Sequence, residues 1–134
     1  MLDRTIERDG VKEYCHENGI GVIAFCPLAQ GLLTGKYLNE IPADSRIAVD
    51  NRFLNDRALT QDVRKKVSLL NELAKERGQS LAQMALSWIL RDGKVCSALI
   101  GASRPEQLEE NVRATENITF TQEELDRIDA CVGV

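Results

Sequence analysis

The sequence contains little of what metal and thiol chemistry require. Its 134 residues include one histidine and four cysteines, and no two cysteines form a C-x-x-C pair. A structural zinc site needs several clustered Cys or His ligands, so such a site is poorly supplied here. We therefore expect no metal site, and we expect free, buried thiols typical of a reducing compartment at Cys15, Cys26, Cys96 and Cys131.

Charge and hydropathy argue against two further classes of protein. The chain has 17 basic and 21 acidic residues, a net charge of -4, and no basic cluster. A nucleic-acid-binding surface needs such a cluster, so nucleic acid is not an expected partner. No apolar run approaches the roughly 20 residues that span a bilayer. The N-terminus is charged and lacks the apolar core of a signal peptide. We expect a cytoplasmic protein that does not bind membranes.

Common catalytic motifs are also missing. The segment Gly31–Lys36 resembles a P-loop, but its glycines are four apart and Tyr37 stands where Ser or Thr is required. No G-x-G-x-x-G and no G-x-S-x-G is present. His16 lies in a polar stretch and fits a solvated surface residue better than a catalyst. The sequence therefore contains no complete reaction centre.

The chain does contain alternating strand-like and helix-like segments. Two apolar runs, 20–25 and 95–100, have the length and composition of strands covered on both faces of a parallel sheet. We interpret residues 1–8 as a polar incoming connection and residues 26–58 as a long loop. This order predicts an α/β protein. Amphipathic spacing and end signals predict helices over 9–18, 61–77, 81–91, 104–114 and 122–131.

Two strands are too few for the burial that their sequences predict. A two-stranded sheet leaves two open edges and cannot cover both of its own faces. The sequence therefore predicts a piece of a larger parallel sheet. On its own, such a piece should be marginally stable, or it should pair with copies of itself or with another chain.

The stretch 95–112 combines a strand, a turn at Gly101 and a helix start. Ser103 and Glu106 have the spacing of a capping box, and Pro105 fits the first helical turn. Free backbone N–H groups, the Ser103 hydroxyl and Arg104 would then converge just beyond a strand end. This arrangement suits an anion such as phosphate. An ordinary strand, turn and well-capped helix without a ligand explains the same pattern. Thr60, the pair Ser80 and Gln83, and the pair Thr121 and Glu124 predict further caps.

Two stretches in combination resemble the aldo-keto reductase family. They are PLAQGLLTGKY at 27–37 and IGASRPEQLEEN at 100–111, and the helix over 80–90 between them fits as well. The resemblance covers essentially the whole chain, and it is strongest to the group that includes bacterial L-glyceraldehyde 3-phosphate reductases and potassium-channel β-subunits. It implies a TIM (β/α)8 barrel that binds NADPH at the carboxyl ends of its strands and reduces aldehydes and ketones. Residues 1–134 would be the C-terminal portion of that barrel, with two parallel strands and about five helices.

The resemblance also implies which residues hold NADP. An arginine and a hydroxyl at a helix N-terminus suit the 2′-phosphate, which favours NADP over NAD. The loop 38–58 would close over the cofactor. The residues implied to line the pyrophosphate and ribose are Pro27, Leu28, Gln30 and Gly31, with Lys36 near the diphosphate. Those implied to hold the 2′-phosphate and adenine are Gly101, Ser103, Arg104, Gln107, Glu110 and Asn111.

The family's catalytic tetrad of Asp, Tyr, Lys and His lies in the half of the barrel that this chain does not match. Neither Tyr14 nor Tyr37 fits the family's tyrosine motifs, so we predict no catalytic residue and no activity for the chain alone. Three functions stay open: the NADP-binding part of an NADPH-dependent reductase of small aldehydes, a non-catalytic NADP-sensing or regulatory module, or an inert truncated remnant. The aldehyde would be a partner only of the complete protein, and an N-terminal half would be a partner of this chain.

Overall fold

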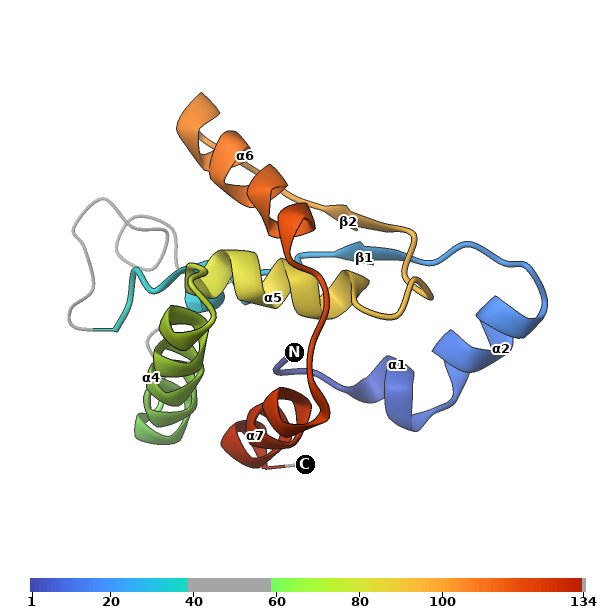
Figure 1. Cartoon of the computed structure of the whole chain (residues 1–134), viewed down its shortest axis with the longest axis horizontal. Helices are drawn as coiled ribbons and strands as arrows, with labels where there is room; N and C mark the ends of the chain where they lie inside the picture. Colours follow the sequence, from blue (N-terminus) through green and yellow to red (C-terminus); the bar gives the residue numbers. More distant parts are fainter. Residues whose placement is uncertain (39–58, 134) are drawn as a thin grey trace.

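The central element is helix α5, Leu81–Leu90, in a computed structural model that describes residues 1–38 and 59–133. It contacts strand β2 (Ser97–Leu99), helices α4 (Gln61–Glu76) and α6 (Pro105–Val112), and the 3-10 helices η1 (Ala29–Thr34) and η3 (Arg113–Glu116) (Figure 1). The remaining elements are α1 (Thr5–Arg8), α2 (Val11–Glu17), β1 (Ile23–Phe25) and α7 (Gln122–Val132).

Strands β1 and β2 are parallel and pair in the register Ile23 to Ser97, Ala24 to Ala98 and Phe25 to Leu99. The α/β class and the parallel pairing are therefore confirmed. Both strands are shorter than the predicted ranges 20–25 and 95–100. Together they form the only sheet among the described residues.

One face of this sheet is bare, so the prediction of strands buried on both faces is wrong for this chain. Ile23 is 67% exposed, Phe25 77% and Leu99 65%. The alternate residue Ala24 turns the other way and packs against the main core. Helix α5 covers one face of the sheet, and the described residues provide no second layer for the other. The apolar sequences of the two strands therefore require cover on both faces of the sheet, and this two-stranded sheet has cover on one face only.

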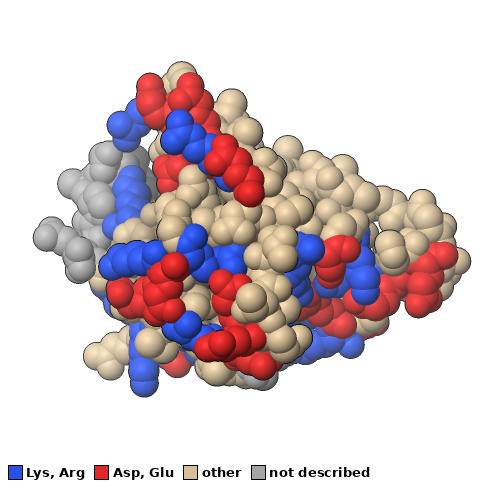
Figure 2. Space-filling view, viewed as in Figure 1, with Lys and Arg blue, Asp and Glu red and all other residues tan. Residues whose placement is uncertain are grey.

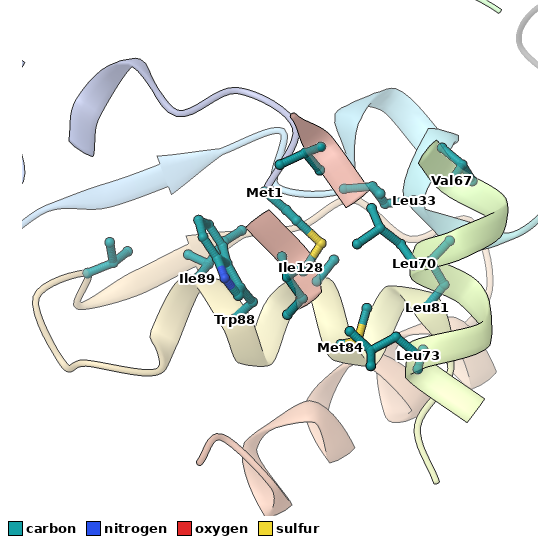
Figure 3. Packing of buried hydrophobic residues seen from close by; sticks show 14 residues of the cluster. Met1, Leu33, Val67, Leu70, Leu73, Leu81, Met84, Trp88, Ile89 and Ile128 are labelled. Carbon is teal, nitrogen blue, oxygen red and sulfur yellow. The ribbon is translucent and has the colours of Figure 1, made fainter. Parts of the chain in front are cut away.

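The core lies between the helices (Figure 3). Leu70 and Leu73 of α4, Met84 and Trp88 of α5, and Ile128 of α7 point toward one another. Eight of the ten residues of α5 are buried, because its apolar residues surround most of its circumference. Leu33 of η1 and Met1 complete this cluster. Helices α4, α5 and α7 are therefore the well-packed part of the chain.

Three predicted caps are confirmed. The Thr60 hydroxyl accepts a hydrogen bond from the backbone N–H of Val63 at 3.2 Å. Ser80 with Gln83 and Thr121 with Glu124 form reciprocal capping boxes. Helices α4, α5 and α7 match their predicted ranges to within one residue at each end.

The first residues, predicted as a polar incoming connection, include a short helix and two buried side chains. Residues 5–8 form α1, Gly10 adopts a left-handed conformation with φ of 69°, and α2 begins only at Val11. Met1 and Arg4 are each 6% exposed. The Arg4 guanidinium stacks on the Trp88 ring at 4.2 Å from its centroid, and Arg91 stacks on the same ring at 3.8 Å. Ring stacking and ion pairing allow the charged Arg4 side chain to be buried.

Glu7 is the centre of the ion-pair network that holds this segment. It accepts hydrogen bonds from Arg4 at 2.7 Å, Lys12 at 2.8 Å and Arg91 at 2.7 Å. Burial opposes ionisation of this carboxyl, but the three cationic donors outweigh it and lower the pKa of Glu7 to about 2. Lys12 also donates to Asp92 at 2.8 Å.

The thiols are free, as predicted, but they are not buried. Cys26 and Cys96 are exposed and Cys15 and Cys131 are partly exposed. Cys26 and Cys96 flank the short strands, where the missing second layer leaves them open.

Within residues 1–38 and 59–133, no three His, Cys, Asp or Glu side chains gather as metal ligands, and no helix is long and apolar enough to cross a bilayer. The predicted closing loop falls on residues outside the described ranges, except for Leu38.

Candidate functional site

A groove of about 700 Å³ lies at the carboxyl ends of β1 and β2. One wall comes from residues 26–37, which follow β1, and the other from residues 99–111, which end β2 and begin α6. Ala82 of α5 contributes the remaining contact. Because the two strands are parallel, the segments that follow them emerge at the same edge of the sheet. This edge is where open and closed parallel sheets bind ligands.

The backbone of the first wall is strained. Cys26, Ala29 and Gln30 have positive φ values of 49°, 48° and 58° although none of them is glycine. Each left-handed non-glycine residue costs on the order of 1 kcal/mol, and such residues concentrate at binding sites. Gly31, with φ of 100°, completes the turn.

Buried anchors hold this strained segment in place. Leu33 is 1% exposed and belongs to the main core, while Tyr37 is 4% exposed and packs with Leu32 and Leu59 in a second cluster. The Thr34 hydroxyl donates to the carbonyl oxygen of Gly31 at 2.7 Å. The groove wall is therefore preformed by packing.

Gln30 lines this groove and carries a buried polar atom. Its side-chain Oε1 is inaccessible to solvent and has no hydrogen-bond partner among the described residues. A buried polar atom without a partner is costly, which adds to the strain of this wall. Lys36 also lines the groove and brings a positive charge to this wall.

The second wall differs from the prediction in how its helix begins. Helix α6 starts at Pro105 with Arg104 as the N-cap, so the third helical residue is Gln107 and not Glu106. The Gln107 side-chain oxygen accepts hydrogen bonds from the backbone N–H groups of Ser103 at 2.8 Å and Arg104 at 3.3 Å. The predicted capping box of Ser103 with Glu106 is therefore wrong. The extended backbone of Arg104 places the helix start one residue later than the Ser103 cap requires.

Both predicted motifs meet at this one groove. Every predicted site residue except Arg104 lines it, namely Pro27, Leu28, Gln30, Gly31, Lys36, Gly101, Ser103, Gln107, Glu110 and Asn111. Arg104 is exposed at the start of α6, next to Ser103 in sequence, and is not part of the lining. Among the described charged side chains, only Lys36 and Glu110 line the groove, and the charged residues of α6 itself are all acidic.

The prediction missed several lining residues. Thr34 and Tyr37 lie inside the first motif, so their positions beside glycines could have indicated them. Cys26, Leu99 and Ile100 directly follow or end the strands, and the same edge rule could have included them. Ala82 belongs to a helix far along the chain, and only the packing of α5 brings it here.

Comparison with known proteins places these observations in a family. The model of the aldo/keto reductase family matches residues 1–133. The chain belongs to this family. L-glyceraldehyde 3-phosphate reductase of Escherichia coli is 54% identical over 132 residues, which are 96% of this chain and 38% of that enzyme. A probable voltage-gated potassium channel subunit beta of Oryza sativa is 43% identical over 117 residues, covering 85% and 36% of the two chains.

Solved structures of family members show the same fold. A thermostable aldo-keto reductase in complex with the inhibitor epalrestat is 30% identical and superposes with a TM-score of 0.61, covering 96% of this chain and 36% of that one. Glycerol dehydrogenase of Gluconobacter oxydans is also 30% identical, with a TM-score of 0.76 and coverage of 98% and 39%. These neighbours are TIM barrels, so the two strands and their helices correspond to part of a barrel. The chain spans less than two fifths of the length of these relatives.

Proposed function

We propose that this chain provides the NADP-binding part of an NADPH-dependent aldo-keto reductase, and that reduction of the aldehyde requires the rest of the barrel. The observation that carries the proposal is the meeting of the two motifs at one groove beyond the carboxyl ends of parallel strands. A nucleotide that spans both walls would use every predicted lining residue. In family barrels this end of the sheet carries the active site.

The chemistry of the groove fits a dinucleotide phosphate. The amide side chain of Gln30 can form a hydrogen bond with a ribose hydroxyl, and Lys36 provides a cation for the diphosphate. Pro27, Leu28 and Gly31 line the same wall without adding charge. Gly31 in particular allows a close approach of the backbone, because its φ of 100° disfavours any side chain.

The start of α6 fits a phosphate monoester. Backbone N–H groups at a helix N-terminus favour an anion, and Ser103 and Arg104 stand at that terminus. Gln107 holds the backbone of both residues, so their side chains extend from a fixed turn. We assign Ser103 and Arg104 to the 2′-phosphate, and Gln107, Glu110 and Asn111 to the adenosine, with Gly101 allowing the phosphate to approach the backbone.

The chain itself would not catalyse the reduction. NADPH, when bound, supplies the hydride. The acid that protonates the carbonyl oxygen, and the groups that orient the aldehyde, would come from the remaining barrel. His16, the one histidine, lies exposed on α2, outside the groove lining. The substrate class of the whole protein would be small aldehydes, in line with the name of the Escherichia coli relative.

The bare sheet face suggests how the rest of the barrel would join. Ile23, Phe25 and Leu99 offer an apolar surface beside two open strand edges. A polypeptide that supplies further parallel strands would cover both. An N-terminal half of the barrel is thus the expected partner, and self-association is the expected substitute in its absence.

Fluorescence titration of the 134-residue chain with NADPH and with NADH tests the binding proposal. We expect weak, saturable binding of NADPH and weaker binding of NADH. Arg104→Leu should reduce the preference for NADPH. Arg113→Leu, an exposed arginine in η3 outside the groove lining, is the matched control and should leave the preference unchanged. Absence of saturable binding, or equal loss in both variants, contradicts the assignment.

Co-expression with a polypeptide that supplies the other strands tests the catalytic part of the proposal. We expect NADPH-dependent aldehyde reduction only from the combined chains. Reduction by the purified chain alone contradicts the claim that the reacting groups lie elsewhere. Nucleotide binding without any complementation favours a sensing module instead.

A further inference from the structure

Helix α6 carries one wall of the groove but is barely anchored by apolar packing. Its only buried residue is Asn111. Its apolar side chains Leu108 and Val112 are 49% and 57% exposed, and no residue of α6 belongs to the main core. Something other than hydrophobic burial must therefore fix this helix against α5.

A line of polar side chains supplies that attachment. We define the α5 seam as Gln79, Gln83 and Ser87, which are spaced four residues apart and therefore share one side of α5 and the turn before it. Each reaches a backbone carbonyl beyond α5. Gln83 Nε2 donates to Glu110 O at 3.0 Å, the Ser87 hydroxyl lies 2.8 Å from Ala114 O, and Gln79 Nε2 donates to Asn117 O at 3.1 Å.

The seam is itself held rigidly. Gln79 Nε2 also donates to the Ser87 oxygen at 3.0 Å, and Ser87 is fully buried. The Gln83 side-chain oxygen accepts from the backbone N–H of Ser80 at 2.9 Å, as part of the capping box of α5. One amide thus caps α5 with its oxygen and holds α6 with its nitrogen.

The carbonyl that Gln83 contacts belongs to the last turn of α6. Carbonyls in that turn have no partner within the helix, so they need a donor from elsewhere. The same turn carries Glu110 and Asn111, which line the groove. A shift of this turn would move both residues relative to the wall formed by residues 26–37.

We propose that Gln83 is a positioning residue of the site: its donated hydrogen bond, supported by the α5 seam, sets the position of α6 and thereby the second wall of the groove. Gln83 is not among the residues that line the groove. The expected effect of Gln83 on nucleotide binding rests on the proposed function. The expected effect of Gln83 on the position of α6 is independent of that function.

Gln83→Glu separates the two tasks of this side chain. A carboxylate can still accept from the Ser80 N–H and is favoured at this helical position, so the α5 cap is preserved. It cannot donate to Glu110 O, so the link to α6 is lost. Ser80→Ala is the matched control, because it weakens the same capping box and leaves the link to α6 intact.

Amide hydrogen exchange of the 134-residue chain measures the link directly. In Gln83→Glu we expect protection of the amides of residues 106–112 to fall about 5- to 10-fold, as expected for the loss of one hydrogen bond. The amides of α4 should be unchanged, and so should the thermal midpoint. Ser80→Ala should lower the thermal midpoint without selective loss in α6.

NADPH affinity in the same variants measures the positioning. We expect Gln83→Glu to weaken binding about 5-fold or more at an unchanged thermal midpoint, and Ser80→Ala to leave binding near that of the parent chain. Unchanged exchange in α6 overturns the proposal. Increased exchange with unchanged affinity also overturns it, because α6 would then not set the site. If the parent chain binds no nucleotide, the proposed function fails while hydrogen exchange still decides whether Gln83 holds α6.

Discussion

The helices and the sheet of this chain differ in how completely their apolar side chains are buried. In α4, α5 and α7 the core residues are nearly inaccessible, with Leu70, Met84 and Ile128 each at 0% exposure. In the sheet, Phe25 and Leu99 remain mostly exposed although they occupy strand positions. Figure 2 shows a largely uncharged surface over the region where Figure 1 places β1 and β2.

This contrast separates the part of the chain that its own packing stabilises from the part that further strands would have to cover. Helices α4, α5 and α7 share one core, so their hydrophobic free energy is realised within the chain. The strands pack through one face, so their second face gains only when further strands cover it. The groove lies at the carboxyl ends of those strands, and its walls are held by η1 and α6, which both contact α5.

The largest expected effect is in the helical core. Leu70→Ala removes a fully buried side chain from α4 and should lower the free energy of unfolding by about 2–5 kcal/mol. Leu69→Ala, one residue earlier and 45% exposed, should change it by less than about 0.5 kcal/mol. Urea denaturation followed by circular dichroism measures both. Equal losses of unfolding free energy in the two variants would contradict the assignment of Leu70 to the core and of Leu69 to the surface of α4.

The next effect concerns the ion pairs that hold the N-terminal segment to the core. The pKa of Glu7 is about 2 in the folded chain and near its ordinary value of 4.5 when the chain is unfolded. The stabilisation is therefore complete above pH 4.5 and is lost as the pH falls toward 2. It amounts to at most about 3 kcal/mol, and solvent screening reduces it.

Comparison with Glu7→Gln isolates this contribution. We expect the parent chain to be more stable than the variant at pH 7 and the two to converge as the pH approaches 2. Denaturation curves at several pH values measure the difference. A difference that stays constant with pH would mean that Glu7 contributes through packing and not through its charge.

A smaller effect should distinguish the two walls of the groove. Gly31→Ala places a side chain at φ of 100°, so it should cost about 1–2 kcal/mol. Gly101→Ala on the other wall meets no atom within 4 Å and has no positive φ, so it should change the free energy of unfolding by less than about 0.5 kcal/mol. Thermal denaturation measures both. A neutral Gly31→Ala would mean that the first wall is not held in its strained conformation.

The smallest effect on the isolated chain should come from the bare sheet face. Phe25→Ser should change the free energy of unfolding of the monomer by less than about 0.5 kcal/mol, because the ring is 77% exposed. It should instead reduce self-association, as measured by light scattering after size exclusion. A loss above about 1.5 kcal/mol in the monomer would show that this face is covered in solution, and the contrast between helices and sheet would then disappear.

Local signals in the sequence predicted the helices well. The capping boxes of Ser80 and Thr121 involve residues three apart, and the structure contains both. Ser103 failed because Gln107 competes with Glu106 for the role of third helical residue, and spacing alone does not decide between them. The prediction that both faces of the strands are covered was wrong, because an apolar run shows that a face needs to be covered but does not show which residues cover it.

Contacts between residues far apart in the sequence could not be predicted from local sequence patterns. Glu7 pairs with Arg91, 84 residues away, and Lys12 with Asp92, 80 residues away, so the charged N-terminal segment gave no sign of burial. In the site, physical reasoning from the residues indicated the turn at 101–104, for which we propose anion binding. The first wall was indicated by the family resemblance. Its strained backbone became visible only in the structure, at Cys26, Ala29 and Gln30.

Trp88, the only tryptophan of the chain, lies between the guanidinium groups of Arg4 and Arg91 and outside the groove lining. Its emission will therefore respond to whether the first residues are docked on α5. Because NADPH absorbs light where tryptophan emits, docking is followed on the chain without nucleotide, and filling of the groove is followed by nucleotide emission excited at wavelengths that tryptophan does not absorb. The chain thus carries a built-in optical probe of its own N-terminal docking.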